Sequence, residues 1–380
     1  MKLLALRLSA LLAILCAAGC GSRPKAALED FTVPVYRPAY ASGFEILGAE
    51  GLQSTILRTR TPWQGAEGEG TALCILRNGE ETPADFDGEV LRGEAQRIVC
   101  MSSTHVALLD AVGAVRRIVG ISGVDGVSNP YIAAHRKAIG EVGYEGNIDY
   151  ERLLSLQPDL VLLFGVQGAS SMEPKLRELG IPFVYMGEYL EESPLGKAEW
   201  LIAAGELTGC RAEAEKCFDS IPQRYDALRK RVAEAGSKAP KVMINTPYGD
   251  SWFMASRGSY VARLIADAGG DYIYRKNTSN RSLPIDLEEA YLLAAEADIW
   301  INVGDFATLG EMKARMPRFA AVKSMQHGEV YNCDRRVNAA GGNDYWESGV
   351  VHPDLVLRDL TKIFHPELVA DDFVYYRRVE

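Results

Sequence analysis

The chain has 380 residues, of which 24% are charged, and its formal net charge at pH 7 is −10. An acidic surface of this kind makes nucleic acid a poor partner, because binding to nucleic acid depends on Lys and Arg side chains that neutralise phosphates. The length exceeds one typical domain, so we expect two lobes, each with its own core.

Residues 1–19 are predicted to be a signal peptide. Lys2 and Arg7 supply the positive start, and residues 8–18 form an apolar stretch well below the roughly 20 residues that span a bilayer. Small residues end the segment. We therefore expect these residues to be removed on export, which takes away two positive charges and leaves a mature chain with a net charge of about −12.

Cys20 comes directly after these small residues and resembles the lipid-bearing cysteine of bacterial lipoproteins, although Ala17 stands where a leucine is usual. Acyl chains on Cys20 would hold the protein on a membrane surface without a spanning helix. The alternative is an ordinary secretory signal in which the cysteine lies at this place by chance. We expect a periplasmic protein with a lipid anchor.

The later cysteines are predicted to be small buried apolar residues rather than disulfide partners. No CxxC motif occurs. Cys210 and Cys217 are two helical turns apart, which separates their Cα atoms by about 10 Å, too far for a disulfide. The set consists of Cys74, Cys100, Cys210, Cys217 and Cys333.

Two segments precede the first predicted lobe. Residues 20–40 contain prolines and scattered charges, and they are predicted to form a lipidated tether without a core. Short alternating apolar runs follow, interrupted by Pro62 and a glycine-rich turn. They predict a small antiparallel β ornament over residues 41–95, attached to the first lobe.

From residue 96 onward, buried apolar runs alternate with amphipathic helices, which is typical of a parallel sheet covered on both faces. Residues 96–193 are predicted to form the first α/β lobe, and residues 237–380 the second. Between them, apolar residues at helical spacing predict one long linker helix over residues 194–236. The predicted fold class is α/β, with two three-layer lobes joined by one long helix. Strands are expected at residues 97–101, 118–121, 160–164, 183–186, 241–245, 252–255, 299–303 and 330–332.

Three motifs carry a resemblance to a known family. Ser102-Ser103-Thr104 follows the opening strand, Ile148–Leu154 leads into Gln157–Val161, and Arg177–Pro182 closes a helix before the next strand. Over about residues 95–366 the sequence resembles the periplasmic binding proteins that serve ABC importers of iron chelates, haem and cobalamin. The counterpart of the second motif in the second lobe lacks its proline. The resemblance implies a ligand held in the cleft between two lobes.

The carboxyl ends of the strands identify the candidate binding residues, because ligands of open α/β sheets bind where these loops converge. The loops there are rich in aromatic side chains, which offer flat faces to a large planar or macrocyclic ligand. Arg335 or Arg336 would supply bidentate hydrogen bonds to carboxylates or an anionic chelate. The alternative is that half of the aromatic residues pack the core. The candidates are Thr104, His105, Phe164, Tyr189, Tyr248, Trp252, Arg335, Tyr345 and Trp346.

His105 stands at a helix start in the first of these loops, where it would ligate a metal centre directly. A lone histidine more often bonds a neighbouring backbone group, and the five histidines form no HxxxH or HExxH motif. We therefore expect no metal or cofactor of the protein's own. The ligand is expected to bring its own metal, iron or cobalt.

The resemblance also implies that one exposed glutamate on each lobe pairs with arginines of the importer's membrane subunits. Glu151 matches its motif, and Glu288 is the candidate in the second lobe. The alternative role for both is structural, because a glutamate in the first turn of a helix stabilises the helix dipole.

Together these features predict a monomeric, non-enzymatic capture protein that delivers an iron complex, a ferric siderophore or haem, to an ABC permease and its ATPase. Cobalamin is the alternative ligand. The rival of another class is a lipid-anchored hydrolase or metal-chelate-processing enzyme, but no GxSxG, zincin or P-loop motif is present. A surface scaffold lipoprotein, the third class, would have no deep cleft.

Overall fold

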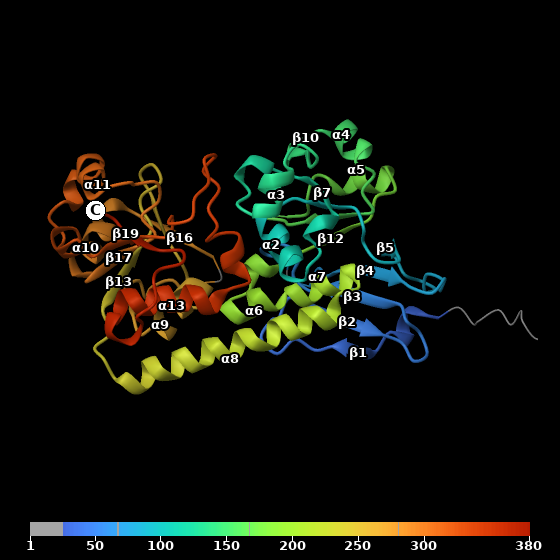
Figure 1. The fold of residues 1–380 in the computed structure, drawn as a ribbon, viewed down its shortest axis with the longest axis horizontal. Helices are drawn as coiled ribbons and strands as arrows, with labels where there is room; N and C mark the ends of the chain where they lie inside the picture. The colour runs from blue at the N-terminus through green and yellow to red at the C-terminus, as the bar shows by residue number, and fades with distance from the viewer. Residues whose placement is uncertain (1–25, 67, 167, 280) are drawn as a thin grey trace, which may run out of the picture.

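The computed structural model describes residues 26–380 except residues 67, 167 and 280. Figure 1 shows two lobes side by side, with helix α8 (Arg211–Ala235) running beneath both and a separate β sheet beside the first lobe. This is the two-lobed α/β fold expected from the sequence. The predicted signal peptide and Cys20 lie outside the described residues. Within the described part of the chain, no helix combines the length and the apolar character that crossing a membrane requires.

The β ornament is a five-stranded sheet in which the strands follow chain order. β1 to β4 pair antiparallel, as expected, whereas β5 runs parallel to β4. Ile46, Leu57 and Leu73 are fully buried and continue into the core of the first lobe. The strands are β1 (Val33–Tyr36), β2 (Phe44–Gly48), β3 (Thr55–Thr59), β4 (Thr71–Leu76) and β5 (Glu89–Arg92).

The prediction of a tether over residues 20–40 is wrong for the described part of that segment. β1 pairs with β2, and Phe31 is only 2% exposed. The carboxylate of Glu199, far along the chain, accepts three hydrogen bonds from the segment and a fourth from the residue directly after it. This long-range contact orders residues whose own composition favours no core. The donors are the hydroxyl of Tyr36 and the backbone N–H groups of Ala39, Tyr40 and Ala41.

The first lobe is built on a five-stranded sheet of order β12-β11-β6-β7-β8, with all neighbours parallel. The four strands predicted for this lobe are β6, β7, β11 and β12. β6 and β11 are buried at every position because helices cover both faces. The strands are β6 (Ile98–Cys100), β7 (Ile118–Ile121), β8 (Gly140–Glu141), β11 (Leu160–Leu163) and β12 (Phe183–Tyr185). The helices are α2 (Ser103–Ala111), α3 (Pro130–His135), α4 (Tyr150–Ser155) and α5 (Glu173–Glu178), and β9 (Gly143–Tyr144) pairs with β10 (Asn147–Ile148).

The connector between the lobes consists of three helices, so the prediction of one helix over residues 194–236 is wrong. α6 (Pro194–Glu199) is followed by α7 (Leu201–Thr208) and α8 (Arg211–Ala235). α7 ends at Gly209, whose φ of 68° lies in the left-handed region. Glycine adopts this conformation at little steric cost, so the chain turns there before α8 begins.

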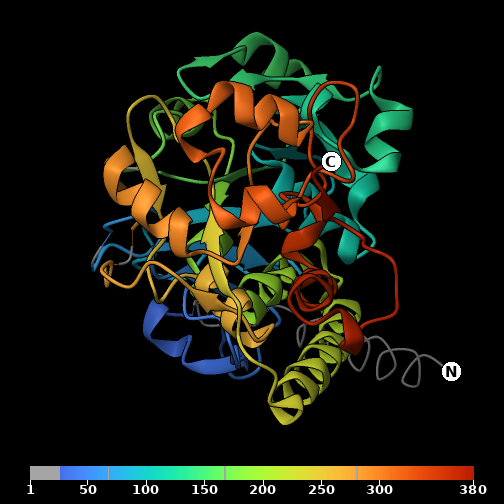
Figure 2. The ribbon, with the colours of Figure 1, turned by 90° about the vertical axis from the view of Figure 1, so that its left-hand side faces the viewer.

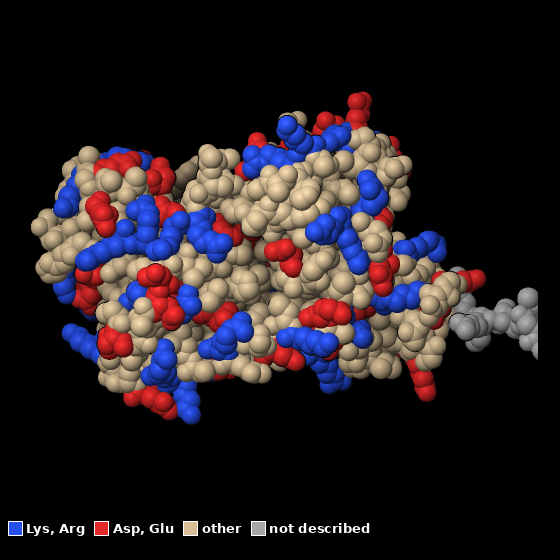
Figure 3. All heavy atoms as spheres, viewed as in Figure 1, with Lys and Arg blue, Asp and Glu red and all other residues tan. Residues whose placement is uncertain are grey.

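α8 spans the distance between the lobes. It packs against α7 at the first lobe and against α13 (Pro353–Phe364) of the second. Figure 2 shows α13, in red, beside the yellow-green α8. Arg224 on α8 pairs with Asp354 on α13 at 2.6 Å, and Asp354 is buried. Figure 3 shows acidic and basic side chains interspersed over this face of the molecule, so the excess negative charge is not gathered into one patch there.

The second lobe repeats the architecture with a sheet of order β15-β13-β17-β18-β19, in which only β19 runs antiparallel to its neighbour. The predicted strand at residues 252–255 is not part of this sheet, because β14 pairs with β16 as a separate ribbon. The strands are β13 (Lys241–Ile244), β14 (Trp252–Met254), β15 (Asp271–Tyr272), β16 (Leu283–Ile285), β17 (Ile299–Ile301), β18 (Val330–Asn332) and β19 (Arg377–Arg378). The other helices are α9 (Tyr260–Asp267), α10 (Leu287–Glu296), α11 (Leu309–Arg315) and α12 (Lys323–His327).

Candidate ligand-binding cleft

The first wall of the cleft is formed where β6 ends and α2 begins. Ser102 caps α2, and its side chain accepts a hydrogen bond from the backbone N–H of Thr104. Such a cap is expected at a strand-to-helix turn, because a serine oxygen replaces a partner that the first helical N–H groups lack. The hydroxyl groups and the positive end of α2 therefore face the space between the lobes.

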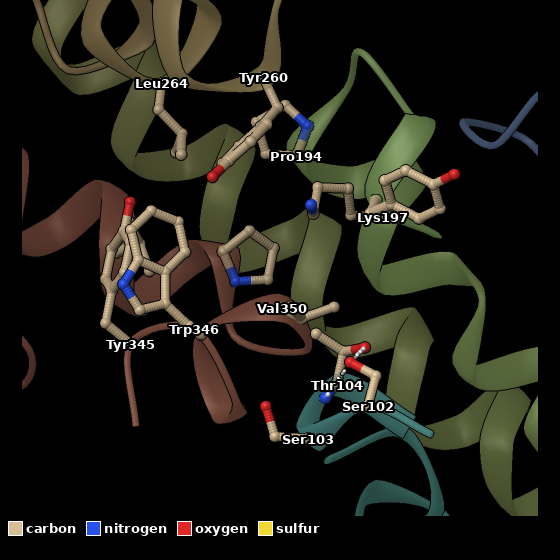
Figure 4. Close-up of a pocket in the computed structure, with 14 residues that line it drawn as sticks. Ser102, Ser103, Thr104, Pro194, Lys197, Tyr260, Leu264, Tyr345, Trp346 and Val350 are labelled. Atoms are coloured by element: carbon tan, nitrogen blue, oxygen red, sulfur yellow. Dashed lines mark hydrogen bonds between the residues drawn. The ribbon is translucent and has the colours of Figure 1, made fainter. Parts of the chain in front are cut away.

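A cavity of about 380 Å³ lies between the lobes, and Figure 4 shows its lining. The first lobe contributes the start of α2 and Tyr189. The connector contributes Pro194 and Lys197, and the second lobe contributes Tyr260, Tyr345 and Trp346 with apolar side chains around them. Four aromatic rings thus surround a space in which Lys197 is the only charged lining residue. Such a lining suits an apolar ligand that carries few polar groups.

The aromatic residues of the second lobe differ in how firmly they are held. Tyr345 is 5% exposed, and its ring lies edge-on to those of Trp346 and Tyr376, with centroids 4.7 Å and 5.6 Å away. Trp346 is 49% exposed. Tyr345 is therefore fixed by packing, whereas Trp346 presents a free ring face to the cleft.

A second cavity of about 740 Å³ adjoins the first, since Tyr189 and Tyr260 line both. Its other walls are more polar and include Glu192, Ser256 and Arg281. The cleft therefore has an aromatic part and a more polar part.

Buried charges lie beneath the aromatic part of the cleft. The hydroxyl of Thr104 donates to Glu188 Oε1 at 2.5 Å, and Glu188 is 2% exposed. Burial raises the pKa of Glu188, against the effect of the Thr104 hydrogen bond and of Lys197. Burial also lowers the pKa of the Lys197 ammonium, while Glu188 and Glu191 act in the opposite direction. These groups place polar chemistry at one point of a mainly apolar surface.

The sequence profile of the family described as Periplasmic binding protein matches residues 98–337, well over half of the chain. The chain belongs to this family. An uncharacterized lipoprotein of Methanocaldococcus jannaschii is 27% identical over 290 residues, which cover 73% of this chain and 67% of the relative. An uncharacterized ABC transporter substrate-binding lipoprotein of Bacillus subtilis is 20% identical over 64% of this chain and 74% of its own length.

Solved structures share the fold of this periplasmic binding protein. A periplasmic haem-binding protein from Pseudomonas aeruginosa has a TM-score of 0.58 at 18% identity, covering 75% of this chain and 98% of its own. The vitamin B12 binding protein of Vibrio cholerae has a TM-score of 0.51 at 14% identity, covering 71% and 96%. The Fe3+–Desferal-bound siderophore-binding protein of the same organism has a TM-score of 0.51 at 16% identity, covering 71% and 99%. Members of this family are transport proteins and not enzymes.

Four of the predicted ligand-binding residues line the aromatic cavity of this periplasmic binding protein: Thr104, Tyr189, Tyr345 and Trp346. Phe164 does not line this cavity; its ring centroid lies 6.5 Å from that of Tyr189, and it lines another, mainly apolar cavity of about 440 Å³. The loop rule therefore located both sides of the cleft.

The prediction that His105 faces the cleft is wrong. His105 is fully buried, with its ring centroid 6.4 Å from that of Phe164. Burial lowers the pKa of His105 to about 3. Because α2 begins at Ser103, the third helical residue turns inward toward the sheet while Thr104 remains at the cavity wall.

Trp252 is also wrongly predicted to bind the ligand. It is fully buried, packs against Trp300 and Phe319, and donates through Nε1 to the carbonyl of Ile244. Its strand lies in the separate ribbon, which directs the indole into the core of the second lobe.

Tyr248 and Arg335 lie outside the walls of the cavities described above. Tyr248 is 82% exposed on the turn after β13. Arg335 is exposed, and its backbone N–H bonds the carbonyl of Tyr375. The neighbouring Arg336 pairs with Asp344 at 3.0 Å, so it is engaged within the second lobe.

Lys197 and Tyr260 are among the lining residues that were missed from the sequence. Both lie just inside helices that begin with a serine cap, Ser193 for α6 and Ser259 for α9. The Ser-Pro pair at residues 193–194 signals a helix start in the sequence. Because residues 194–236 were predicted to form one linker helix, Lys197 was not expected at the cleft. The described residues contain no group of three or more potential metal ligands.

The two predicted docking glutamates occupy equivalent positions. Glu151 is in the first turn of α4, which Asp149 caps, and Glu288 is in the first turn of α10, which Asp286 caps. Both side chains are exposed. Glu288 also pairs with Arg318 at 3.2 Å on the surface.

Proposed function

We propose that this periplasmic binding protein is the substrate-binding lipoprotein of an ABC importer and that it captures an iron complex, a ferric siderophore or haem, between its lobes. The observation that carries the proposal is the aromatic cavity built jointly by both lobes and the connector. Flat rings on opposite walls suit a compact or planar chelate, and a ligand held there contacts both lobes at once.

The names of similar proteins support this proposal. One relative is named as an ABC transporter substrate-binding lipoprotein, and structures with the same fold are named for haem, vitamin B12 and an iron siderophore. In the proposed role, Cys20 carries the lipid that keeps the protein near its permease in the periplasm, and the chain acts as a monomer. Glu151 and Glu288 would contact the membrane subunits, one from each lobe.

Titration of the full chain in detergent with haemin, ferrioxamine and cyanocobalamin tests the proposal, with tryptophan fluorescence and equilibrium dialysis as measurements. Because Trp346 is half exposed in the cavity, we expect a bound iron chelate to quench its emission. The quench should be largely lost in Trp346→Phe and retained in Trp63→Phe, since Trp63 lies outside the cavity wall.

The three ligands also discriminate between the alternatives. Binding of cyanocobalamin alone would assign a cobalamin importer and contradict the iron assignment. Binding of none of the three, in both measurements, would contradict the capture function itself. Chemical conversion of a bound chelate during incubation would favour the chelate-processing enzyme.

A further inference from the structure

Lys197 lies at the floor of the cleft, on α6 of the connector, and its side chain points into the aromatic cavity (Figure 4). Its ammonium makes no hydrogen bond or ion pair with any residue that the structure describes. The ammonium lies over the Tyr260 ring, with Nζ 4.2 Å from the ring centroid. Lys197 is partly buried and lines the cavity, so its ammonium is available to an acceptor that enters the cleft.

The nearby carboxylates do not supply that partner. Glu191 is engaged with the residues just before β2 and with the connector, since it accepts from Ser42, Gly43 and Trp200 Nε1. Glu188 accepts from Thr104 through one oxygen and lies beyond ion-pair distance of Lys197. Both carboxylates make the electrostatic potential around the ammonium more negative, but neither forms an ion pair with it.

The opposite wall adds to the attraction for an anion. Ser102, Ser103 and Thr104 line the cavity at the start of the nine-residue α2, where the helix dipole is positive. The ammonium and this helix start thus face the same space from two directions, in surroundings that are otherwise aromatic or aliphatic (Figure 4).

We propose that Lys197 binds a negatively charged oxygen group of the ligand, so that the cleft selects metal chelates that carry a free carboxylate or similar oxyanion. The aromatic rings hold the body of the chelate, and Lys197 sets its orientation and charge. This inference rests on the proposed function and narrows its ligand class. A neutral or cationic analogue of the same size leaves the ammonium unpaired and binds about 10- to 100-fold more weakly.

Two ligand pairs that differ only in charge test the inference on the full chain. One is haemin and haemin dimethyl ester, which share the ring and the iron. The other is ferrioxamine B, which carries an ammonium, and its N-succinyl derivative, which carries a carboxylate. For the pair that binds, we expect the carboxylate-bearing member to bind about 10- to 100-fold more tightly. In Lys197→Met the carboxylate-bearing member should bind more weakly and the other member should bind as before, so the preference should disappear. Lys197→Arg should restore the preference.

Lys362→Met is the matched control, because Lys362 also lies over an aromatic ring, that of Phe373, but does not line the cavity. It should leave the preference unchanged. Equal binding of both members to the unaltered protein, or an equal loss for both members in Lys197→Met, would overturn the inference while leaving chelate capture intact. Binding of cyanocobalamin alone would also overturn it. If no chelate binds, the inference and the proposed function fall together.

Discussion

The side chain of Glu347 in the second lobe accepts a hydrogen bond from the backbone N–H of Ser128 in the first lobe, at 2.6 Å. Next to it, the Ser128 hydroxyl donates to the carbonyl of Gly342, and the side-chain amide of Asn338 donates to the carbonyl of Val127. We call these contacts the interlobe bridge. The loop that supplies them also carries the cavity residues Tyr345 and Trp346, so ligand contact and lobe contact share one segment.

The free energy of unfolding is expected to fall as the pH rises, because the buried carboxyl group of Glu347 must then ionise. Burial raises the pKa of Glu347 to about 7, although the Ser128 N–H favours the ionised form. The folded protein therefore holds this proton more tightly than the unfolded chain. The contribution of the protonated Glu347 carboxyl group to the free energy of unfolding is fully present below the ordinary glutamate pKa. It is lost as the pH rises through about 7. We expect the loss to be about 1–3 kcal/mol of unfolding free energy.

Urea unfolding near pH 5 and near pH 8 measures this effect. Glu347→Gln, which keeps an oxygen for Ser128 but does not titrate, should show a smaller drop in stability between the two conditions. Glu213→Gln, on the exposed surface of α8, should behave like the unaltered protein. An identical drop in the Glu347→Gln variant would show that this carboxyl group does not cause it.

Replacing each of two tryptophans by alanine should separate folding from binding. Trp252→Ala removes a fully buried indole and its hydrogen bond to Ile244, so we expect a loss of about 3–5 kcal/mol in unfolding free energy. Trp346→Ala changes a half-exposed residue and should alter stability by less than about 1 kcal/mol. Its effect should instead be a roughly 10-fold weaker binding of the chelate. Chemical denaturation and ligand titration of both variants check the two expectations, and equal effects of the two variants on stability would contradict them.

The sheets could be predicted from the sequence because their strands are continuous apolar runs. β6 and β11 are buried on both faces, and such runs allow few interpretations. The loops at their carboxyl ends then follow from chain order, which placed Thr104 and Tyr189 in the cleft.

The rest depended on properties that local patterns do not contain. The inward position of His105 beside the outward Thr104 depends on the residue at which α2 begins. The burial of Trp252 depends on β14 leaving the main sheet to pair with β16. The order of residues 33–41 depends on Glu199, which is more than 150 residues away. The position of Lys197 in the cavity wall depends on the division of the connector into three helices, where the apolar spacing suggests one long helix.

Reversing the charge of the two docking glutamates should uncouple ligand binding from transport. Glu151→Lys with Glu288→Lys changes exposed side chains and should leave chelate affinity and stability unaltered. With the importer's permease and ATPase in proteoliposomes, we expect stimulation of ATP hydrolysis to fall roughly 10-fold or more, because charges of one sign would then meet. Glu234→Lys, near the end of α8, is the matched control. Full stimulation by the double variant would place the docking surface elsewhere.

Glu199 is expected to hold the N-terminal segment against the floor of the cleft. It lies two residues from Lys197 on α6, and its carboxylate accepts from the Tyr36 hydroxyl and three backbone N–H groups. Glu199→Ala leaves these donors without their partner, so we expect a loss of about 3 kcal/mol or more in unfolding free energy. Residues 33–41 should then become sensitive to limited proteolysis before the lobes unfold, whereas Glu213→Ala should not have this effect. Unchanged resistance of the segment in Glu199→Ala would show that pairing of β1 with β2 alone holds it in place.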